Sequence, residues 1–107
     1  MQKRIYLLYT LLPTLGFLFA TPALSAEADL AKAEKVYKRS CATCHGKQGE
    51  KPAMGESKII NQLQPEEIST ALSERKAGNI TGAGSPAKQR LSEQDIHNLS
   101  EYIQTLK

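Results

Sequence analysis

The part of the chain that follows residue 26 has few large apolar residues from which to build a core. It is about 80 residues long, the size of one domain, and it contains neither Phe nor Trp. Domains of this size bury a modest share of their surface and commonly rely on a disulfide, a metal or another added core element. We therefore expect something besides side chains to fill this core. Its large apolar residues include Val36, Tyr37, Ile59, Ile60, Leu63, Ile68, Leu72, Ile80, Leu91, Ile96, Leu99, Tyr102, Ile103 and Leu106.

The first 26 residues have the pattern of a secretory signal peptide. A short basic start at residues 1–4 precedes an apolar run at 5–20, and small residues follow at 21–26. The alternative is a retained membrane anchor, but the apolar run is shorter than the roughly 20 residues that span a bilayer, and Pro13 interrupts it. We expect cleavage near residues 25–28, which leaves one exported domain at 27–107 in the periplasm.

The charge of the exported part is close to neutral. Lys3 and Arg4 are two of the 14 Lys and Arg residues, so cleavage leaves 12 against the 11 Asp and Glu residues. A basic stripe with interleaved aromatic residues, which is typical of nucleic-acid binding, is absent from the sequence. We expect no nucleic-acid partner and a monomeric protein.

Helical signals run through most of the exported part. Apolar residues at three-and-four spacing predict an amphipathic helix over residues 29–40. A short helix is expected at 57–63, and Pro65 is placed to begin another that continues towards Gly78. Glycines and a proline within 78–90 predict a surface loop.

The last helix has the clearest local signals. Ser92 and Asp95 have the spacing of a capping box, and Leu91 and Ile96 that of a hydrophobic staple. The apolar face then continues through Ile96, Leu99, Ile103 and Leu106, with Tyr102 on its flank. No stretch alternates polar and apolar residues as a strand does. We therefore expect an all-α domain.

Cys41, Cys44 and His45 concentrate reactive chemistry in the pentapeptide Cys-Ala-Thr-Cys-His. Residues three apart in a helical turn lie on the same side, so the two sulfurs can face one flat object. The spacing C-x-x-C-H is a signature of covalent haem attachment. In that chemistry the sulfurs form thioethers with the haem vinyl groups, and the histidine binds the iron. A haem would also complete the small core.

Other interpretations of these residues fit the sequence less well. A disulfide between Cys41 and Cys44 would close a very small loop and would leave His45 unexplained. A thiol-disulfide redox pair has the same C-x-x-C spacing, but its usual strand-helix-strand setting is missing. A zinc site that adds His97 would need the adjacent Cys44 and His45 in one tetrahedral shell, which is awkward.

The segments VYKRSCATCHGKQGE, at residues 36–50, and LSEQDIHNLSEYIQTL, at 91–106, resemble the two ends of small bacterial class I cytochromes c. The resemblance implies helices packed around one covalent haem c, with the first and last helices crossing beside it. It also implies a one-electron carrier rather than an enzyme, and no further catalytic constellation is visible. The partners it implies are respiratory redox proteins in the periplasm or at the outer face of the inner membrane.

The resemblance also implies a second axial ligand, usually a methionine from the loop before the last helix. The loop at 78–90 contains no Met, and the only methionine after the signal is Met54. A thioether suits haem iron, so Met54 is a candidate distal ligand. The competing interpretation is that its unbranched side chain fills space against the macrocycle.

Several other groups could approach the iron, and the sequence selects none of them. His97 is a strong ligand chemically, but it lies one position off the apolar face of the last helix, so we expect it to face solvent. A vacant distal position is the other possibility, and it would make the protein a binder of small diatomic gases. The weaker candidates are Lys76, Asn79 and Lys88. Lysines that could surround the haem edge and attract an acidic redox partner are Lys35, Lys38, Lys47, Lys51, Lys58, Lys76 and Lys88.

Overall fold

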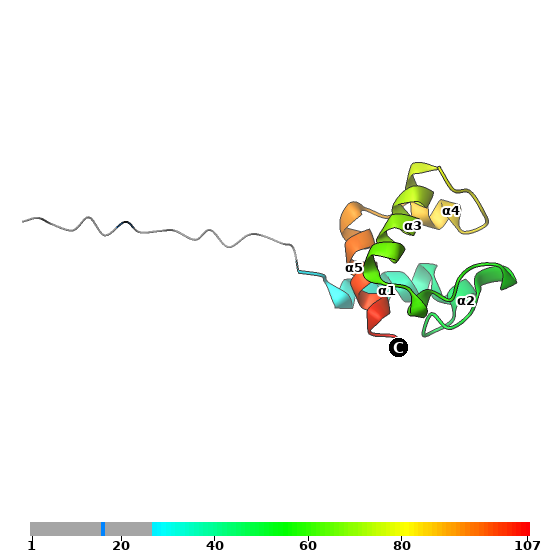
Figure 1. Ribbon diagram of the computed structural model, residues 1–107, viewed down its shortest axis with the longest axis horizontal. Helices are drawn as coiled ribbons and strands as arrows, with labels where there is room; N and C mark the ends of the chain where they lie inside the picture. Colours follow the sequence, from blue (N-terminus) through cyan, green and yellow to red (C-terminus); the bar gives the residue numbers. More distant parts are fainter. Residues whose placement is uncertain (1–15, 17–26) are drawn as a thin grey trace, which may run out of the picture.

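The computed structural model describes Gly16 and residues 27–107, so the predicted signal peptide lies outside the described residues except for Gly16. Every regular element in the described part is helical, as expected (Figure 1). None of these helices is long and apolar enough to cross a membrane. The elements are α1 (Leu30–Ser40), α2 (Ala42–His45), the 3-10 turns η1 (Ala53–Gly55) and η2 (Ile60–Gln62), α3 (Pro65–Ala77), α4 (Ser85–Gln89) and α5 (Glu93–Gln104).

Helices α1 and α5 cross and pack against each other (Figure 1). At the crossing, the rings of Tyr37 and Tyr102 lie with centroids 5.6 Å apart and tilted by 54°, a favourable aromatic arrangement. Ala33 is 1% exposed, so its methyl group fits within the crossing. The backbone N–H of Asp29 donates to Asn98 Oδ1 at 3.0 Å. The contact between first and last helices implied by the resemblance is therefore present.

Local capping explains where the longer helices begin. Asp29 caps α1 by accepting from the N–H of Lys32 at 3.0 Å. The predicted box at the start of α5 is confirmed, since Ser92 Oγ accepts from Asp95 N at 3.0 Å and Asp95 Oδ2 accepts from Ser92 N at 3.0 Å. These bonds satisfy N–H groups that a helix leaves without internal partners.

Two of the expected local structures differ from the sequence prediction. The short helix expected at 57–63 is only the single 3-10 turn η2, because Ile59 and Leu63 on either side of it are extended. The segment 78–90, expected to be a loop, contains the short helix α4. Pro86 lies in the first turn of α4, where a proline's missing N–H costs nothing, and this favours a helical turn within a glycine-containing segment.

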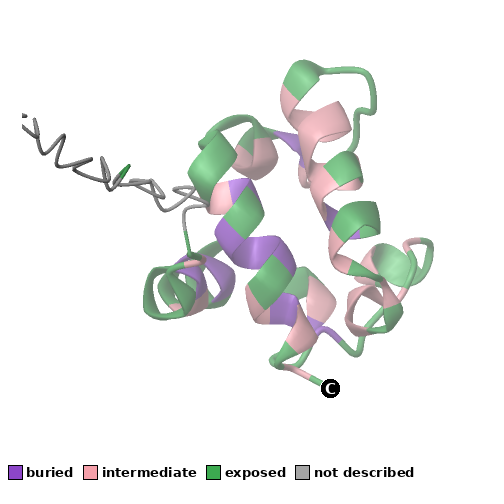
Figure 2. Ribbon diagram, turned by 60° about the vertical axis from the view of Figure 1, so that its left-hand side comes forward, coloured by how far each residue is buried: buried purple, intermediate pink, exposed green. Residues whose placement is uncertain are grey.

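The core lies between α1, α3 and α5, and Figure 2 marks the buried positions on these helices in purple. Helix α3 packs against α5, and α4 packs against α3. The staple residues Leu91 and Ile96 are both buried in this core. The buried apolar residues are Ala33, Val36, Tyr37, Ile68, Leu91, Ile96, Leu99 and Ile103.

Candidate cofactor site

Cys41, Cys44 and His45 lie on a single helical turn that begins where α1 ends. The N–H of Cys41 donates to Tyr37 O at 2.9 Å, which closes α1, and the N–H of His45 donates back to Cys41 O at 2.9 Å, which closes α2. The predicted helical turn is thus present. It holds the two cysteines three positions apart, the spacing that puts side chains on the same side of a helix.

The turn after His45 is held by backbone and side-chain hydrogen bonds. Gly46 is buried and has φ 84° and ψ 163°, a conformation that is essentially restricted to glycine. Its carbonyl accepts a 2.6 Å hydrogen bond from the Tyr37 hydroxyl. The His45 carbonyl accepts from the N–H of Lys51 at 2.9 Å. These bonds fix the backbone on the C-terminal side of the imidazole.

A cleft lies in front of this turn and consists of two adjoining cavities of about 350 and 320 Å³. Each is within the range of small-molecule sites, roughly 300–1,000 Å³. The second reaches the core residues Ile68, Leu99 and Ile103, so the cleft continues into the middle of the domain. Residues that line both cavities are Cys41, His45, Ser57, Leu72, Arg75 and Lys88.

The His45 imidazole has the protonation state that a metal ligand needs. Burial lowers its pKa, and the positive charges of Lys88 and Arg75 lower it further. The ring is therefore neutral at neutral pH and offers a nitrogen lone pair. Within the described residues, its buried Nδ1 has no hydrogen-bond partner. A buried polar atom without a partner calls for an explanation, and a group bound in the cleft would supply one.

The two thiols differ in environment. Burial raises the pKa of the Cys41 thiol to about 11, whereas Cys44 is exposed. Reactive redox cysteines have lowered pKa values, so Cys41 does not resemble one. Neither cysteine forms a disulfide within the described residues, and both line the first cavity. This arrangement favours attachment to a flat ligand over thiol-disulfide exchange.

The zinc interpretation has no geometric support in the described part of the chain. No three His, Cys, Asp or Glu side chains come together there as a metal-binding group. His97 is exposed on α5, as the sequence predicted, while the cysteines follow α1.

Met54 lines the first cavity but is 76% exposed. It lies in the 3-10 turn η1 with φ 54° and ψ 22°, an uncommon conformation for a residue other than glycine. Its role as a distal ligand stays a prediction. The weaker candidates Lys76 and Asn79 have partners elsewhere: Lys76 Nζ lies 3.2 Å from Glu93 Oε1, and Asn79 Nδ2 donates to Glu74 Oε2 at 2.9 Å.

Helix α3 contributes residues to the cleft that were not predicted from the sequence. Leu72 and Arg75 line both cavities from this helix, and Ile68 lines the second. These residues are spaced at i, i+4 and i+7, which is the spacing of one face of a helix. That spacing is the sequence signal that could have identified them.

The residues of the cleft fit a covalently bound haem. Two sulfurs and a neutral imidazole on one turn supply the attachment points and a ligand of the kind haem iron takes. Leu72, Leu91 and Ala87 contribute apolar walls to the first cavity. The second cavity lies between Cys41 and His45 and the helices α3 and α5, which contribute Ile68 and Leu99. A haem there would be the added core element that the composition predicted.

Comparison with known proteins supports the same conclusion. Residues 28–103 match the protein family described as cytochrome c oxidase, cbb3-type, subunit III. The chain is 42% identical over 83 residues to cytochrome c-553 of Helicobacter pylori, an alignment that covers 77% of this chain and 86% of that protein. It is 37% identical over 91 residues to cytochrome c-554(547) of Halothiobacillus neapolitanus, which covers 74% of this chain and 98% of that protein.

Proposed function

We propose that this chain carries single electrons between respiratory redox proteins in the periplasm. The reason is that it belongs to the c-type cytochrome family described as cytochrome c oxidase, cbb3-type, subunit III. It is a small monohaem cytochrome whose cofactor is covalently bound haem c. Haem c supplies an iron that alternates between the ferric and ferrous states by one electron. The contributions of the chain's own residues follow from their positions.

In this proposal Cys41 and Cys44 hold the haem through thioether bonds, and His45 is the proximal iron ligand. The hydrogen bonds of Tyr37 and Lys51 on either side of the histidine keep its backbone in place. A ligand that is already positioned changes little when the iron changes oxidation state, and little rearrangement favours fast electron transfer. The neutral imidazole adds no charge to the cleft.

The observation that carries the proposal is the exposure of Cys44 on the same turn as the half-buried Cys41 and His45. A macrocycle bonded to both sulfurs would extend from the core to the surface, because the second cavity reaches Leu99 and the first is lined by exposed residues. Electrons could then leave at an edge that a partner protein can touch. A buried haem with no accessible edge would not suit a carrier.

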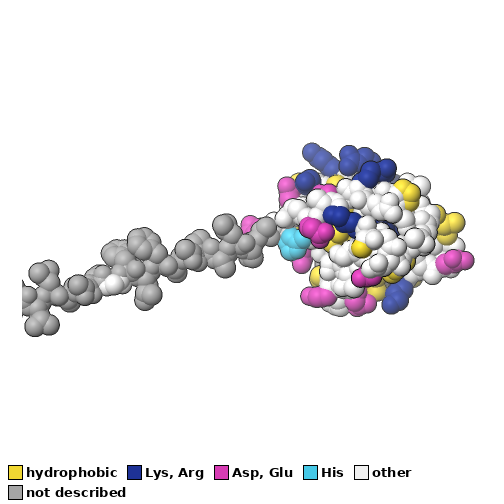
Figure 3. All heavy atoms as spheres, turned by 90° about the horizontal axis from the view of Figure 1, so that it is seen from above, with side chains coloured by type: hydrophobic (Ala, Val, Ile, Leu, Met, Phe, Trp, Pro, Cys, Tyr) yellow, Lys and Arg dark blue, Asp and Glu magenta, His cyan; other side chains and the backbone are white. Residues whose placement is uncertain are grey.

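The distribution of surface charge favours attraction of a partner by local groups of Lys and Arg rather than by the net charge of the protein. The net charge of the exported part is close to zero, but Lys and Arg side chains gather along one margin of the face seen in Figure 3. Exposed Lys58 lines the second cavity, and exposed Lys47 and Lys51 follow His45 in the chain. Such a distribution steers an acidic partner in a salt-dependent way. We expect a periplasmic or membrane-bound redox protein as that partner.

The experiment uses the full-length chain, produced in a bacterium that matures c-type cytochromes. We expect haem-bearing protein in the periplasmic fraction, and a reversible one-electron wave in voltammetry. A variant that lacks residues 2–26 keeps the whole domain, and it should accumulate without haem in the cytoplasm. Haem attached to this truncated variant would contradict export before maturation.

The competing function, binding of a diatomic gas at an open iron, makes a different prediction. It rests on the absence of Met from residues 78–90. Ferrous protein with an open site would bind carbon monoxide rapidly and completely, whereas a carrier with two axial ligands would bind it slowly or incompletely. The carrier assignment would be overturned if the ferrous protein bound carbon monoxide rapidly and completely and also exchanged electrons slowly with an electrode.

A further inference from the structure

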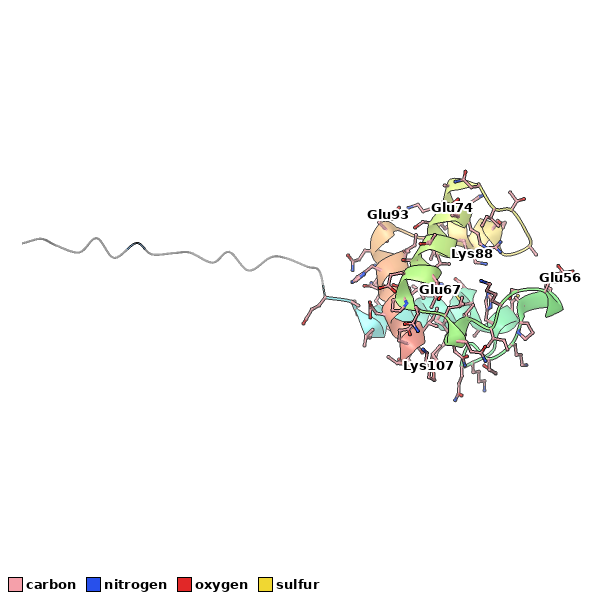
Figure 4. The ribbon with its side chains drawn as sticks, in the orientation of Figure 1. Glu56, Glu67, Glu74, Lys88, Glu93 and Lys107 are labelled. Atoms are coloured by element: carbon pink, nitrogen blue, oxygen red, sulfur yellow. The ribbon has the colours of Figure 1, made fainter. Side chains whose placement is uncertain are left out.

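The short helix α4 places Lys88 against the cofactor cleft. Lys88 lines both cavities, as does His45. Its Nζ lies over the start of its own helix, since a Cβ atom built on Gly84 would be 2.6 Å from it. Figure 4 shows Lys88 on the side of α4 that faces α2 and α3. The side chain therefore lies against the cleft and is partly buried.

Lys88 has no anionic partner in the described part of the chain. No hydrogen bond or ion pair involves its Nζ there, although Lys32, Lys38 and Lys76 all have carboxylate partners. The groups that act on Lys88 electrostatically are Arg75, Cys41 and Cys44. A partly buried ammonium without a carboxylate is costly, so this lysine is better suited to a neutral form or to a bound group.

The surroundings of Lys88 lower its pKa from the ordinary lysine value. Burial is the largest cause and the neighbouring guanidinium of Arg75 adds to it, whereas Cys41 and Cys44 act in the opposite direction. A neutral amine has one lone pair, and imidazole and amine nitrogens are ligands of intermediate softness that suit iron. Lys88 and His45 line the same two cavities, and they reach them from different elements, α4 and α2.

We propose that Lys88 Nζ is the axial ligand of the haem iron on the face opposite His45. The proposal rests on the haem attachment argued above and identifies the distal ligand of that same site. When the nitrogen binds, the ammonium form releases one proton to solvent and the lone pair forms the bond to iron. No change of oxidation state accompanies this step.

The other groups at the cleft are less suited to this role. Arg75 lines both cavities, but a guanidinium keeps its proton and offers no lone pair. Met54 is mostly exposed and follows His45 closely in the chain, whereas Lys88 comes from a separate helix. A thioether ligand raises the reduction potential of haem iron, so amine ligation should give a lower potential than a thioether at the same site.

The test uses full-length protein matured in the periplasm and compares ferric spectra of matched variants. Wild type should be low-spin in electron paramagnetic resonance and should lack the weak far-red band of iron-sulfur ligation. Lys88→Ala and Lys88→Arg should become high-spin. The arginine variant separates loss of the ligand from loss of charge. Lys88→Met should regain a low-spin spectrum, acquire the far-red band and have a raised potential.

Two controls address other sources of a spectral change. Lys58→Ala removes a different lysine from the wall of the second cavity, and Met54→Ala removes the competing ligand, so both should keep the wild-type spectrum. Circular dichroism of each variant checks that the helices are intact. A high-spin wild type, an unchanged Lys88→Ala spectrum, or loss of low-spin iron in Met54→Ala would each overturn the proposal. In the pyridine haemochrome assay, pyridine displaces both axial ligands, so the assay reports haem attachment independently of the distal ligand. Absence of the haemochrome spectrum would indicate that the haem assignment itself fails.

Discussion

The Tyr37 hydroxyl donates a 2.6 Å hydrogen bond to the backbone oxygen of Gly46. The bond ties α1 to the turn that follows His45, across the two cysteines. Tyr37 is 0% exposed, and Gly46 is buried, so water cannot replace either partner. One buried hydrogen bond thus links the crossing of α1 and α5 with the backbone that follows His45.

Replacing Tyr37 by Phe should destabilise the haem-bearing protein by about 1–3 kcal/mol, because the buried Gly46 carbonyl would lose its partner. Guanidinium unfolding followed by circular dichroism measures this free energy. Tyr102→Phe deletes the hydroxyl of the facing ring, which makes no hydrogen bond to the described residues, so it should change stability by less than about 0.5 kcal/mol. Equal losses in the two variants would contradict a special role for the Tyr37 bond.

Alkaline pH should weaken the domain through the same side chain. Burial raises the pKa of Tyr37 to about 12, above the ordinary value near 10. The folded state therefore holds this proton more tightly than the unfolded state. Its contribution to stability is fully present below pH 10 and is lost as the pH rises towards 12. Unfolding free energies measured from pH 9 to 12 should fall more steeply for wild type than for Tyr37→Phe, and parallel curves would argue against this origin.

Gly46→Ala should impair both stability and haem loading. Its φ of 84° and ψ of 163° are strained for any residue with a side chain, and a Cβ there would collide with the Glu50 carboxylate. We expect a loss of about 1–3 kcal/mol. Gly55→Ala is the control, because Gly55 has φ 73° but nothing within 4 Å of an added Cβ. Its loss should be the smaller of the two, and the ratio of haem absorbance to protein should stay at the wild-type level.

Each cysteine should carry one covalent bond to the haem. Cys41→Ala and Cys44→Ala should each retain haem through the remaining sulfur, with the pyridine haemochrome band shifted to longer wavelength. The double variant should keep no haem after acid-acetone extraction. Mass spectrometry of the intact chains checks this, since wild type should be heavier than the polypeptide by one haem. An unmodified wild-type mass would refute attachment.

Removing the cap of α5 should weaken the helix crossing without touching the cleft. Ser92→Ala deletes the oxygen that accepts from Asp95 N at 3.0 Å, and such losses cost about 1 kcal/mol. Thr70→Ala removes a hydroxyl from the exposed side of α3 and should be neutral or slightly stabilising, because alanine is the better helix former. Thermal unfolding of the haem-bearing variants measures both. A Ser92→Ala protein as stable as wild type would show that the Asp95 half of the box suffices.

Short-range signals explain how much of this molecule could be predicted. The capping residues of α5, the apolar face of α5 and the helical turn that carries the cysteines depend on neighbours within four positions, and all are found where the sequence placed them. The expected helix at 57–63 was wrong because three apolar residues do not define a helical period. The prediction of a loop at 78–90 did not include α4, because glycine and proline indicate where a regular element is interrupted. They do not indicate whether a short helix forms between two such positions.

By itself, the sequence determined the chemistry at Cys41, Cys44 and His45, because the spacing of attachment sulfurs and an adjacent imidazole is a property of five consecutive residues. It could not choose among the distal candidates. Lys76 and Lys88 are the same residue type in one stretch of chain, yet the first reaches Glu93 and the second enters the cleft. Only the tertiary structure decides this, because the surroundings of each lysine come from helices far apart in the sequence.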